Sequence, residues 1–242
     1  MKEVLVFPAV EKLSVYLKEL LISKTGNVPD GKYLSVALSG GSTPKMVFKH
    51  ISSDNHCDIN WKKIRLFWVD ERCVPPEDEE SNFNMTRNNL LVNINIPDEN
   101  IFRIYGENDP EDEAVRYNRI LEKNVDPVNA WPKFDIVLLG LGEDGHTASV
   151  FPGNNSLFHS TKYSEAVTHP QSGQRRISLT GGVINNAEMV IFVVTGSGKA
   201  EIVKRVLEDD TAADLPASQV NPAKGDLIWL LDDRAAGLLN NY

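Results

Sequence analysis

The feature that most constrains the fold is a short apolar run that ends in a glycine-rich polar segment. Phe134–Leu139 is rich in Ile, Val and Leu and hardly alternates, which is typical of a strand buried on both faces. The run leads into Leu138–Gly153, which reads LLGLGEDGHTASVFPG. Open α/β sheets bind ligands at the carboxyl ends of their parallel strands. The sequence therefore predicts a binding loop immediately after this strand.

Two side chains in this loop carry acid/base chemistry. Asp144 and His146 are two residues apart, so both face one cavity if the loop is extended. Gly140, Gly142 and Gly145 allow positive φ or a close approach to a ligand. A carboxylate beside an imidazole is suited to proton transfer. On this pattern alone an ordinary surface turn is an equally good interpretation, because short glycine patterns are weakly specific.

A second candidate loop follows the predicted strand Lys32–Leu38 and reads SGGSTP. Pro44 suits the first turn of a helix and Ser42 or Thr43 suits its cap, so amide donors point back at the loop. Such a helix start favours an anion. The spacing matches neither the GxxxxGK[ST] loop nor the dinucleotide fingerprint, which disfavours nucleotides. A tight turn that needs glycine for its geometry alone remains the alternative.

Charged residues also stand where other predicted strands end. Ile64–Val69 is followed by Asp70 and Arg72, which are available to a cleft, although solvation is the commoner fate of such charges. Arg176 begins a short predicted strand, and Lys199 follows another one. If the intervening connection returns the chain to the same sheet edge, these two cations can share one phosphate.

Strands alternate with helices along the whole chain. Helices are expected over Ala9–Ile22, Pro110–Asn124 and Glu201–Leu207 from the spacing of their apolar residues. The alternation predicts an α/β fold with a mainly parallel, Rossmann-like sheet covered by helices on both faces. Residues 1–242 are expected to form a single domain. The polar segment Asn154–Gln174 is either a flexible flap across the site or disordered without a function.

Composition narrows the classes of partner. Lys and Arg total 25 against 34 Asp and Glu, a net charge of −9, which opposes nonspecific binding to nucleic acid or to an anionic membrane. Acidic residues and Pro8 interrupt the apolar run at the N-terminus, so neither a signal peptide nor a membrane span is expected, and a cytoplasmic location follows. Cys57 and Cys73 are expected to be free thiols. No metal, organic cofactor or obligate protein partner is indicated.

Several of these motifs together resemble the 6-phosphogluconolactonases, a branch of a superfamily that also contains the glucosamine-6-phosphate deaminases. The resemblance is carried by the Leu138–Gly153 loop, the SGGSTP loop, WVDER at residues 68–72 and LPASQVNP at residues 215–222. It implies hydrolysis of 6-phospho-D-glucono-1,5-lactone to 6-phosphogluconate in the oxidative pentose phosphate pathway. It also implies a small sugar-phosphate lactone as the ligand and no cofactor.

The resemblance also assigns roles to residues. His146 would act as the general base on the water that attacks C1, for which an imidazole is suited near neutral pH. Asp144 would orient His146, and Arg72 would either stabilise the developing oxyanion or bind phosphate. Arg176 and Lys199 correspond to the phosphate-binding cations of the family. The expected substrate-binding residues are Gly40, Gly41, Ser42, Thr43, Asp70, Arg72, Arg176 and Lys199.

Two other functions compete with lactone hydrolysis. The deaminases typically place a tyrosine where Arg72 stands and a glutamate, which assists ring opening, where this chain has Phe151. A lactone is already at the acyl oxidation state and needs only water, a base and a proton donor, so the departure favours hydrolysis. A noncatalytic sugar-phosphate sensor would be expected to lose the base while it keeps the cations, yet His146 is present.

Overall fold

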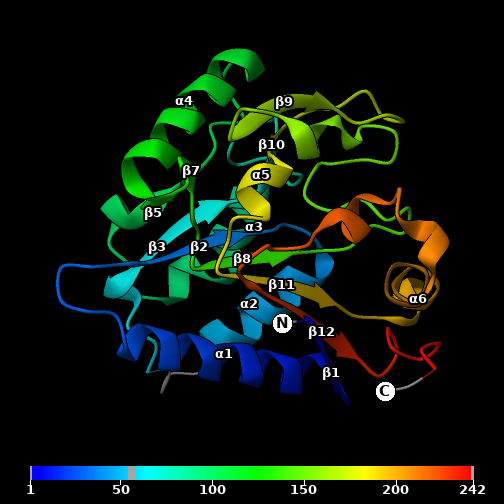
Figure 1. Ribbon diagram of the computed structural model, residues 1–242. Helices are drawn as coiled ribbons and strands as arrows, with labels where there is room; N and C mark the ends of the chain where they lie inside the picture. Colours follow the sequence, from blue (N-terminus) through cyan, green and yellow to red (C-terminus); the bar gives the residue numbers. More distant parts are fainter. Residues whose placement is uncertain (1, 54–57, 241–242) are drawn as a thin grey trace.

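The computed structural model describes residues 2–53 and 58–240. Its centre is a seven-stranded sheet with the order β1-β12-β11-β8-β2-β3-β5 (Figure 1). Every neighbouring pair in this sheet is parallel. The strands are β1 (Lys2–Phe7), β2 (Leu34–Leu38), β3 (Ile64–Trp68), β5 (Ile101–Phe102), β8 (Ile136–Leu139), β11 (Met189–Val194) and β12 (Asp226–Asp232). The predicted parallel α/β fold is confirmed.

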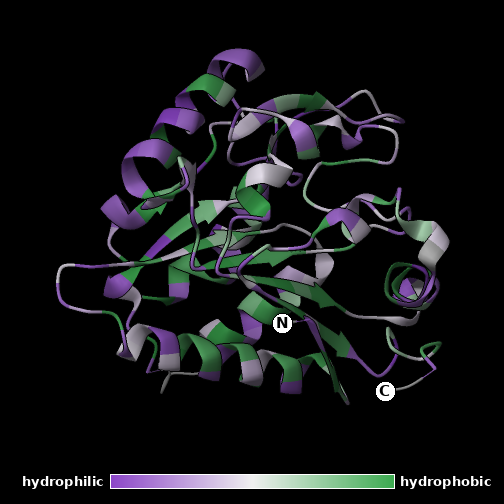
Figure 2. Cartoon of the chain, viewed as in Figure 1, coloured by the Kyte–Doolittle hydropathy of each residue, from purple (hydrophilic) through white to green (hydrophobic). Residues whose placement is uncertain are grey.

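The inner strands are apolar along their whole length because both faces of the sheet are covered. All residues of β2, β8 and β11 are buried, and Figure 2 shows these strands as continuously hydrophobic while the helices carry polar outer faces. One hydrophobic cluster joins the sheet to the helices on both faces. Continuous rather than alternating hydrophobicity is expected for strands buried in this way.

Helices cover both faces of the sheet (Figure 1). α1 (Val10–Gly26) packs against α2 (Ser42–Ser53), which in turn contacts α3 (Asn82–Asn89). On the other face lie α4 (Pro110–Asn124) and the one-turn α5 (Gly181–Ile184), as Figure 1 shows. The remaining helices are α6 (Ala200–Glu208) and the 3-10 helices η1 (Trp61–Lys63), η2 (Leu91–Asn93), η3 (Asp98–Asn100), η4 (Asn155–His159), η5 (Ser197–Lys199), η6 (Asp210–Ala212) and η7 (Pro216–Gln219). Helices on both faces agree with the sequence-based expectation.

A second, antiparallel sheet lies beside α4. It has the order β4-β10-β9, with β4 (Asp70–Arg72), β10 (Arg175–Leu179) and β9 (Ser164–Thr168). The polar segment Asn154–Gln174 therefore contains η4 and β9 rather than a continuous loop. β9 was not predicted from the sequence, because Ala166 and Val167 are its only apolar residues. A two-stranded sheet, β6 (Pro127–Val128) with β7 (Trp131–Pro132), is also present.

The direction in which successive strands are added to the parallel sheet reverses between β2 and β8. From β2 the chain proceeds outward to β3 and β5, whereas from β8 it proceeds the other way to β11 and β12. The loops that follow β2 and β8 therefore diverge from two neighbouring strands. Such a switch point leaves a crevice at the carboxyl end of the sheet.

The expectations that the chain has no membrane span and that its cysteines are free can be compared with the structure. None of the helices in the described residues has the length and apolar character needed to cross a membrane. Cys73 is a free thiol, and burial raises its pKa to about 11. Cys57 lies outside the described residues.

Candidate functional site

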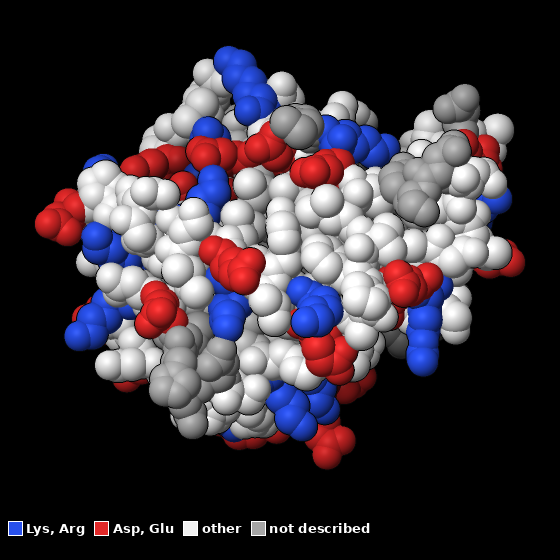
Figure 3. Space-filling model, turned by 90° about the horizontal axis from the view of Figure 1, so that it is seen from below, with Lys and Arg blue, Asp and Glu red and all other residues white. Residues whose placement is uncertain are grey.

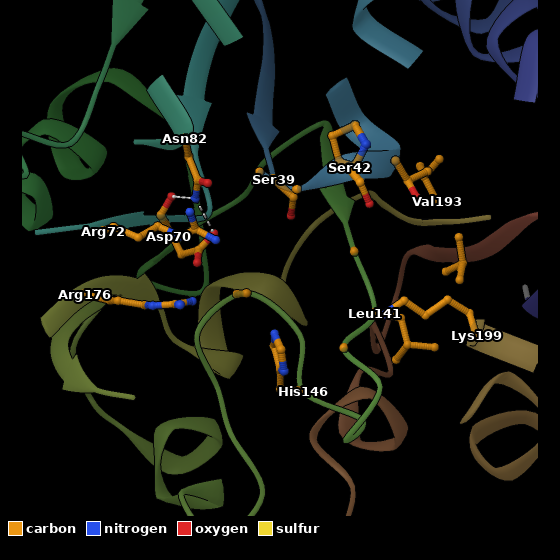
Figure 4. Close-up of a pocket in the computed structure, with 18 residues that line it drawn as sticks. Ser39, Ser42, Asp70, Arg72, Asn82, Leu141, His146, Arg176, Val193 and Lys199 are labelled. Carbon is orange, nitrogen blue, oxygen red and sulfur yellow. Dashed lines mark hydrogen bonds between the residues drawn. The ribbon is translucent and has the colours of Figure 1, made fainter. Parts of the chain in front are cut away.

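A cavity of about 190 Å³ opens at the switch point (Figure 4). It is lined by the loops that follow β2, β8 and β11 and by residues of β4 and β10. Of the ten site residues predicted from the sequence, nine line it: Gly40, Gly41, Ser42, Thr43, Asp70, Arg72, His146, Arg176 and Lys199. The tenth, Asp144, contacts His146. The structure thus brings all the predicted residues to one place.

His146 and Asp144 form a closely coupled pair. The Nδ1 atom of His146 lies 2.6 Å from Oδ1 of Asp144, and the backbone N–H of His146 donates to the same oxygen at 3.1 Å. Burial acts to raise the pKa of Asp144, but the charge and hydrogen bonds of His146 outweigh it, so the pKa lies below its ordinary value. With Nδ1 engaged by the carboxylate, Nε2 is the imidazole nitrogen left for a ligand.

Glycine at position 142 is required by this pair. A Cβ atom there would lie 2.1 Å from Nδ1 of His146 and 2.6 Å from Oδ1 of Asp144. The loop is closed by two hydrogen bonds, from the Gly142 N–H to the His146 carbonyl at 2.8 Å and from Thr147 Oγ1 to the Gly140 carbonyl at 2.9 Å. The imidazole is therefore held by a compact loop rather than carried on a free segment.

The SGGSTP loop supplies backbone donors to the same cavity. Gly41 has a φ of 109°, and α2 starts at the next residue, Ser42. The first N–H groups of an α-helix have no partner within the helix, so those of α2 are free to meet an anion. Ser39 Oγ donates to the Leu138 carbonyl at 2.9 Å, which ties this loop to the strand before the His146 loop.

Two arginines stand side by side in the antiparallel sheet. Arg72 lies directly opposite Arg176 in the ladder between β4 and β10, an arrangement of like charges that is ordinarily destabilising. Within the described residues neither forms a salt bridge with a carboxylate. Burial, with Arg72 adding to it, holds the pKa of Arg176 below its ordinary value. Adjacent cations without a bound carboxylate are suited to an anionic ligand.

The remaining cation, Lys199, comes from a different part of the fold. It ends η5 after β11 and enters the cavity from the side opposite to Arg176 in Figure 4. The preceding turn is fixed by Asp232 of β12, whose two carboxylate oxygens accept from the Gly196 N–H at 2.9 and 3.1 Å. Whether Lys199 and Arg176 hold one phosphate together stays a prediction.

Asp70 was predicted from the sequence, but its buried polar partners Ser149 and Asn82 were missed. Asp70 Oδ2 accepts from Ser149 Oγ at 2.6 Å, and Asp70 Oδ1 accepts from Asn82 Nδ2 at 3.2 Å. Asn82 also packs on Gly40, where a Cβ would lie 1.7 Å from its Oδ1 atom. Asn82 belongs to the SNFNM run at the start of α3, whose Asn and Ser residues are the signal that could have indicated it.

Neighbouring Glu71 holds α3 in place. Its buried carboxylate accepts from the backbone N–H groups of Asn82 and Phe83 at 2.7 and 2.8 Å. Burial raises the pKa of Glu71 to about 7, although these hydrogen bonds act to lower it. The start of α3, and with it Asn82, is thereby attached to β4. No group of three or more His, Cys, Asp or Glu side chains in the described part of the chain is arranged to hold a metal ion.

Comparison with known proteins identifies the family. The sequence profile of the glucosamine-6-phosphate isomerases/6-phosphogluconolactonase family matches residues 9–229. The chain belongs to this family. The resemblance seen in the sequence motifs is thus confirmed.

Relatives in the family are similar over most of their length. A 6-phosphogluconolactonase of Treponema pallidum is 43% identical over 180 residues, covering 74% of this chain and 75% of the relative. One from Haemophilus influenzae is 39% identical over 234 residues, covering 96% and 95%. The solved structure of a 6-phosphogluconolactonase from Trypanosoma cruzi has a TM-score of 0.86 at 28% identity and covers 99% of this chain and 97% of that one.

Proposed function

We propose that this protein hydrolyses 6-phospho-D-glucono-1,5-lactone to 6-phospho-D-gluconate in the oxidative pentose phosphate pathway. The observation that carries the proposal is one cavity that combines the His146–Asp144 pair with three cations and the start of α2. A proton acceptor beside an anion site is what hydrolysis of a phosphorylated lactone requires. The names of the curated relatives support the same reaction.

His146 acts as the general base of this reaction. Its Nε2 atom takes a proton from a water molecule as the water oxygen bonds to C1 of the lactone. The bond between C1 and the ring oxygen then breaks, and the same nitrogen returns the proton to that oxygen. Asp144, on Nδ1, keeps the ring in the required tautomer and stabilises the imidazolium that forms.

The anionic end of the substrate is held by donors and cations. Arg176, Lys199 and the first amides of α2 bind the phosphate dianion, because charge-assisted hydrogen bonds are the strong ones. Arg72 adds a positive charge beside Arg176, suited either to the phosphate or to the oxygen that becomes negative at C1. These three cations make the cavity locally attractive to an anion although the chain as a whole has a net charge of −9.

An initial-rate assay tests the proposal. Purified protein should accelerate lactone opening above an enzyme-free control and should release no ammonia from glucosamine 6-phosphate. The second result is expected because the place of the deaminase glutamate is taken by Phe151, which is 1% exposed and cannot assist ring opening. Absence of any acceleration at saturating lactone would overturn the proposal. Ammonia release would favour the deaminase alternative instead.

We also propose that the protein acts in the cytoplasm on a small molecule, without nucleic acid, a membrane or an obligate protein partner. On the face that includes α1, Lys and Arg are interspersed with Asp and Glu rather than gathered in a patch of one sign (Figure 3). Mixed charge of this kind offers no footprint for a polyanion. Cell fractionation with antibody detection tests the location, and sedimentation at low salt with and without DNA tests the partner.

A further inference from the structure

Phe151 is among the largest fully buried side chains of the described residues, with 1% of its surface exposed. It lies five residues after His146, where the glycine-rich loop ends. A phenyl ring contributes apolar area wherever it is buried, and it also interacts specifically with aromatic and cationic neighbours. The groups that surround this ring therefore decide whether it does more than pack.

The ring contacts three side chains that can carry charge. Its centroid lies 5.0 Å from that of His146 and 4.6 Å from that of His169, and the Arg176 guanidinium carbon lies 5.5 Å from it. His146 and Arg176 both line the cavity, whereas Phe151 does not. One aromatic side chain behind the cavity wall thus supports the proton acceptor and one of the cations.

His169 is the third group in contact with the ring. Its Nδ1 atom accepts from the backbone N–H groups of Gln171 and Ser172, each at 3.2 Å, so the ring is fixed within the turn between β9 and β10. Burial, together with the nearby charge of Arg176, lowers the pKa of His169. His169 is therefore held against the phenyl ring by the hydrogen bonds of its own turn.

We propose that Phe151 is a positioning residue, which holds the His146 imidazole and the Arg176 guanidinium in their working orientations; the inference rests on the proposed hydrolysis. The negative face of an aromatic ring attracts a cation. Arg176 is cationic throughout, and His146 becomes cationic when it accepts the proton from water. The ring thus favours the charged state of His146 that forms during the reaction, beyond its steric support.

Phe151→Met is the first test, because it keeps much of the volume and removes the ring face. The expected result is a kcat lower by about 2- to 10-fold, the share of a lost aromatic contact, together with a higher KM from the loosened Arg176. Phe134→Met is the matched control. Phe134 is 0% exposed and packs edge-on against Phe67 at 5.2 Å, but it precedes β8, at the opposite end of that strand from the cavity. This control should lower the melting temperature and leave both kinetic constants unchanged.

A measurement without substrate keeps the test decisive if Phe151→Met folds poorly. In Phe151→Leu, the ¹H resonances of the His146 ring, assigned by their loss in His146→Gln, should move because the ring current of Phe151 is gone. Unchanged His146 resonances, or unchanged kcat and KM in a folded Phe151 variant, would overturn the inference. If the wild-type protein fails to hydrolyse the lactone, the proposed function fails instead, and the resonance experiment still decides the position of Phe151.

Discussion

His146 is the residue on which the proposed chemistry depends most directly. His146→Gln should lower kcat by about 10²- to 10⁴-fold, the usual contribution of positioned proton transfer, and should leave KM near the wild-type value. Glutamine retains hydrogen-bonding capacity but does not take up a proton near neutral pH. Initial rates against an enzyme-free control measure the effect, because spontaneous opening of the lactone hides the deeper losses. Near-wild-type turnover in the folded variant would remove His146 as the base.

Gly142 provides a test of the same pair that leaves both side chains present. Gly142→Ala would place a Cβ 2.1 Å from His146 Nδ1 and 2.6 Å from Asp144 Oδ1. The two side chains must shift to make room, so their mutual geometry is disturbed and kcat should fall by at least about 10-fold. Gly26→Ala is the control, since a Cβ there meets nothing within 4 Å and should slightly stabilise the end of α1. Equal kcat values for the two variants would show that the observed His146–Asp144 geometry is not needed for turnover.

Arg176 and Lys199, the two cations proposed to bind the phosphate, are tested by measuring substrate binding. Arg176→Ala and Lys199→Ala should each weaken binding by about 1.5–3 kcal/mol, the contribution of a charged hydrogen bond. KM should rise accordingly with a smaller change in kcat. Product inhibition by 6-phosphogluconate should weaken in parallel, which separates loss of binding from loss of chemistry. An unchanged KM in both variants would contradict their assignment.

Among the single residues of the site, the sequence predicted the charged side chains and those in the glycine-rich loops better than the uncharged ones elsewhere. Asp144, His146, Arg72 and Arg176 carry recognisable chemistry and follow predicted strands, so their convergence could be anticipated. Ser149 and Phe151 could not be chosen in this way, because Ser and Phe are common in folded chains. Ser149 contacts Asp70 and Phe151 contacts His146, and only the tertiary structure shows these contacts.

The connection between β11 and η5, which carries Lys199, can be altered by a substitution in the neighbouring strand β12. The Gly196 N–H donates to both carboxylate oxygens of Asp232. Asp232→Asn would replace one of these oxygens with an NH₂ group, which cannot accept a hydrogen bond. The turn that carries Lys199 should loosen, raising KM by up to about 10- to 150-fold, because a hydrogen bond to a charged group is worth about 1.5–3 kcal/mol. Asp233→Asn, at the exposed next position, is the matched control. An unchanged KM in Asp232→Asn would mean that the turn holds Lys199 without this carboxylate.

The sequence predicted long periodic elements well and short polar ones poorly. The helix expected over Pro110–Asn124 has those bounds in the structure, and the one expected over Ala9–Ile22 lies within one residue at its start and extends to Gly26. β4 was interpreted as charges following a strand, since Asp-Glu-Arg has no apolar pattern. It is a strand because Arg72 and Asp70 pair with β10, a partner about a hundred residues later that local propensity does not reveal.

For the whole molecule we expect activity without a metal. The cavity presents Arg72, Arg176 and Lys199, whose charges repel a divalent cation, and His146 is engaged by a single carboxylate. Turnover should therefore survive exhaustive dialysis against EDTA, measured with metal-free substrate. Loss of activity in proportion to the metal removed, with recovery on adding back one metal, would overturn this expectation.

The pairing of β1 with β12 has a consequence for how the protein is made. Among residues 2–53 and 58–240, β1 lies at the edge of the sheet and pairs with β12, with Lys2 opposite Leu227. At a synthesis rate of about 5–20 residues per second, β1 waits on the order of 10 s or more on the ribosome before its partner exists. During that time the growing chain exposes an unpaired apolar edge. β12 thus joins two strands that are made before it, and a chain that stops before β12 would leave both β1 and β11 open to association with other chains.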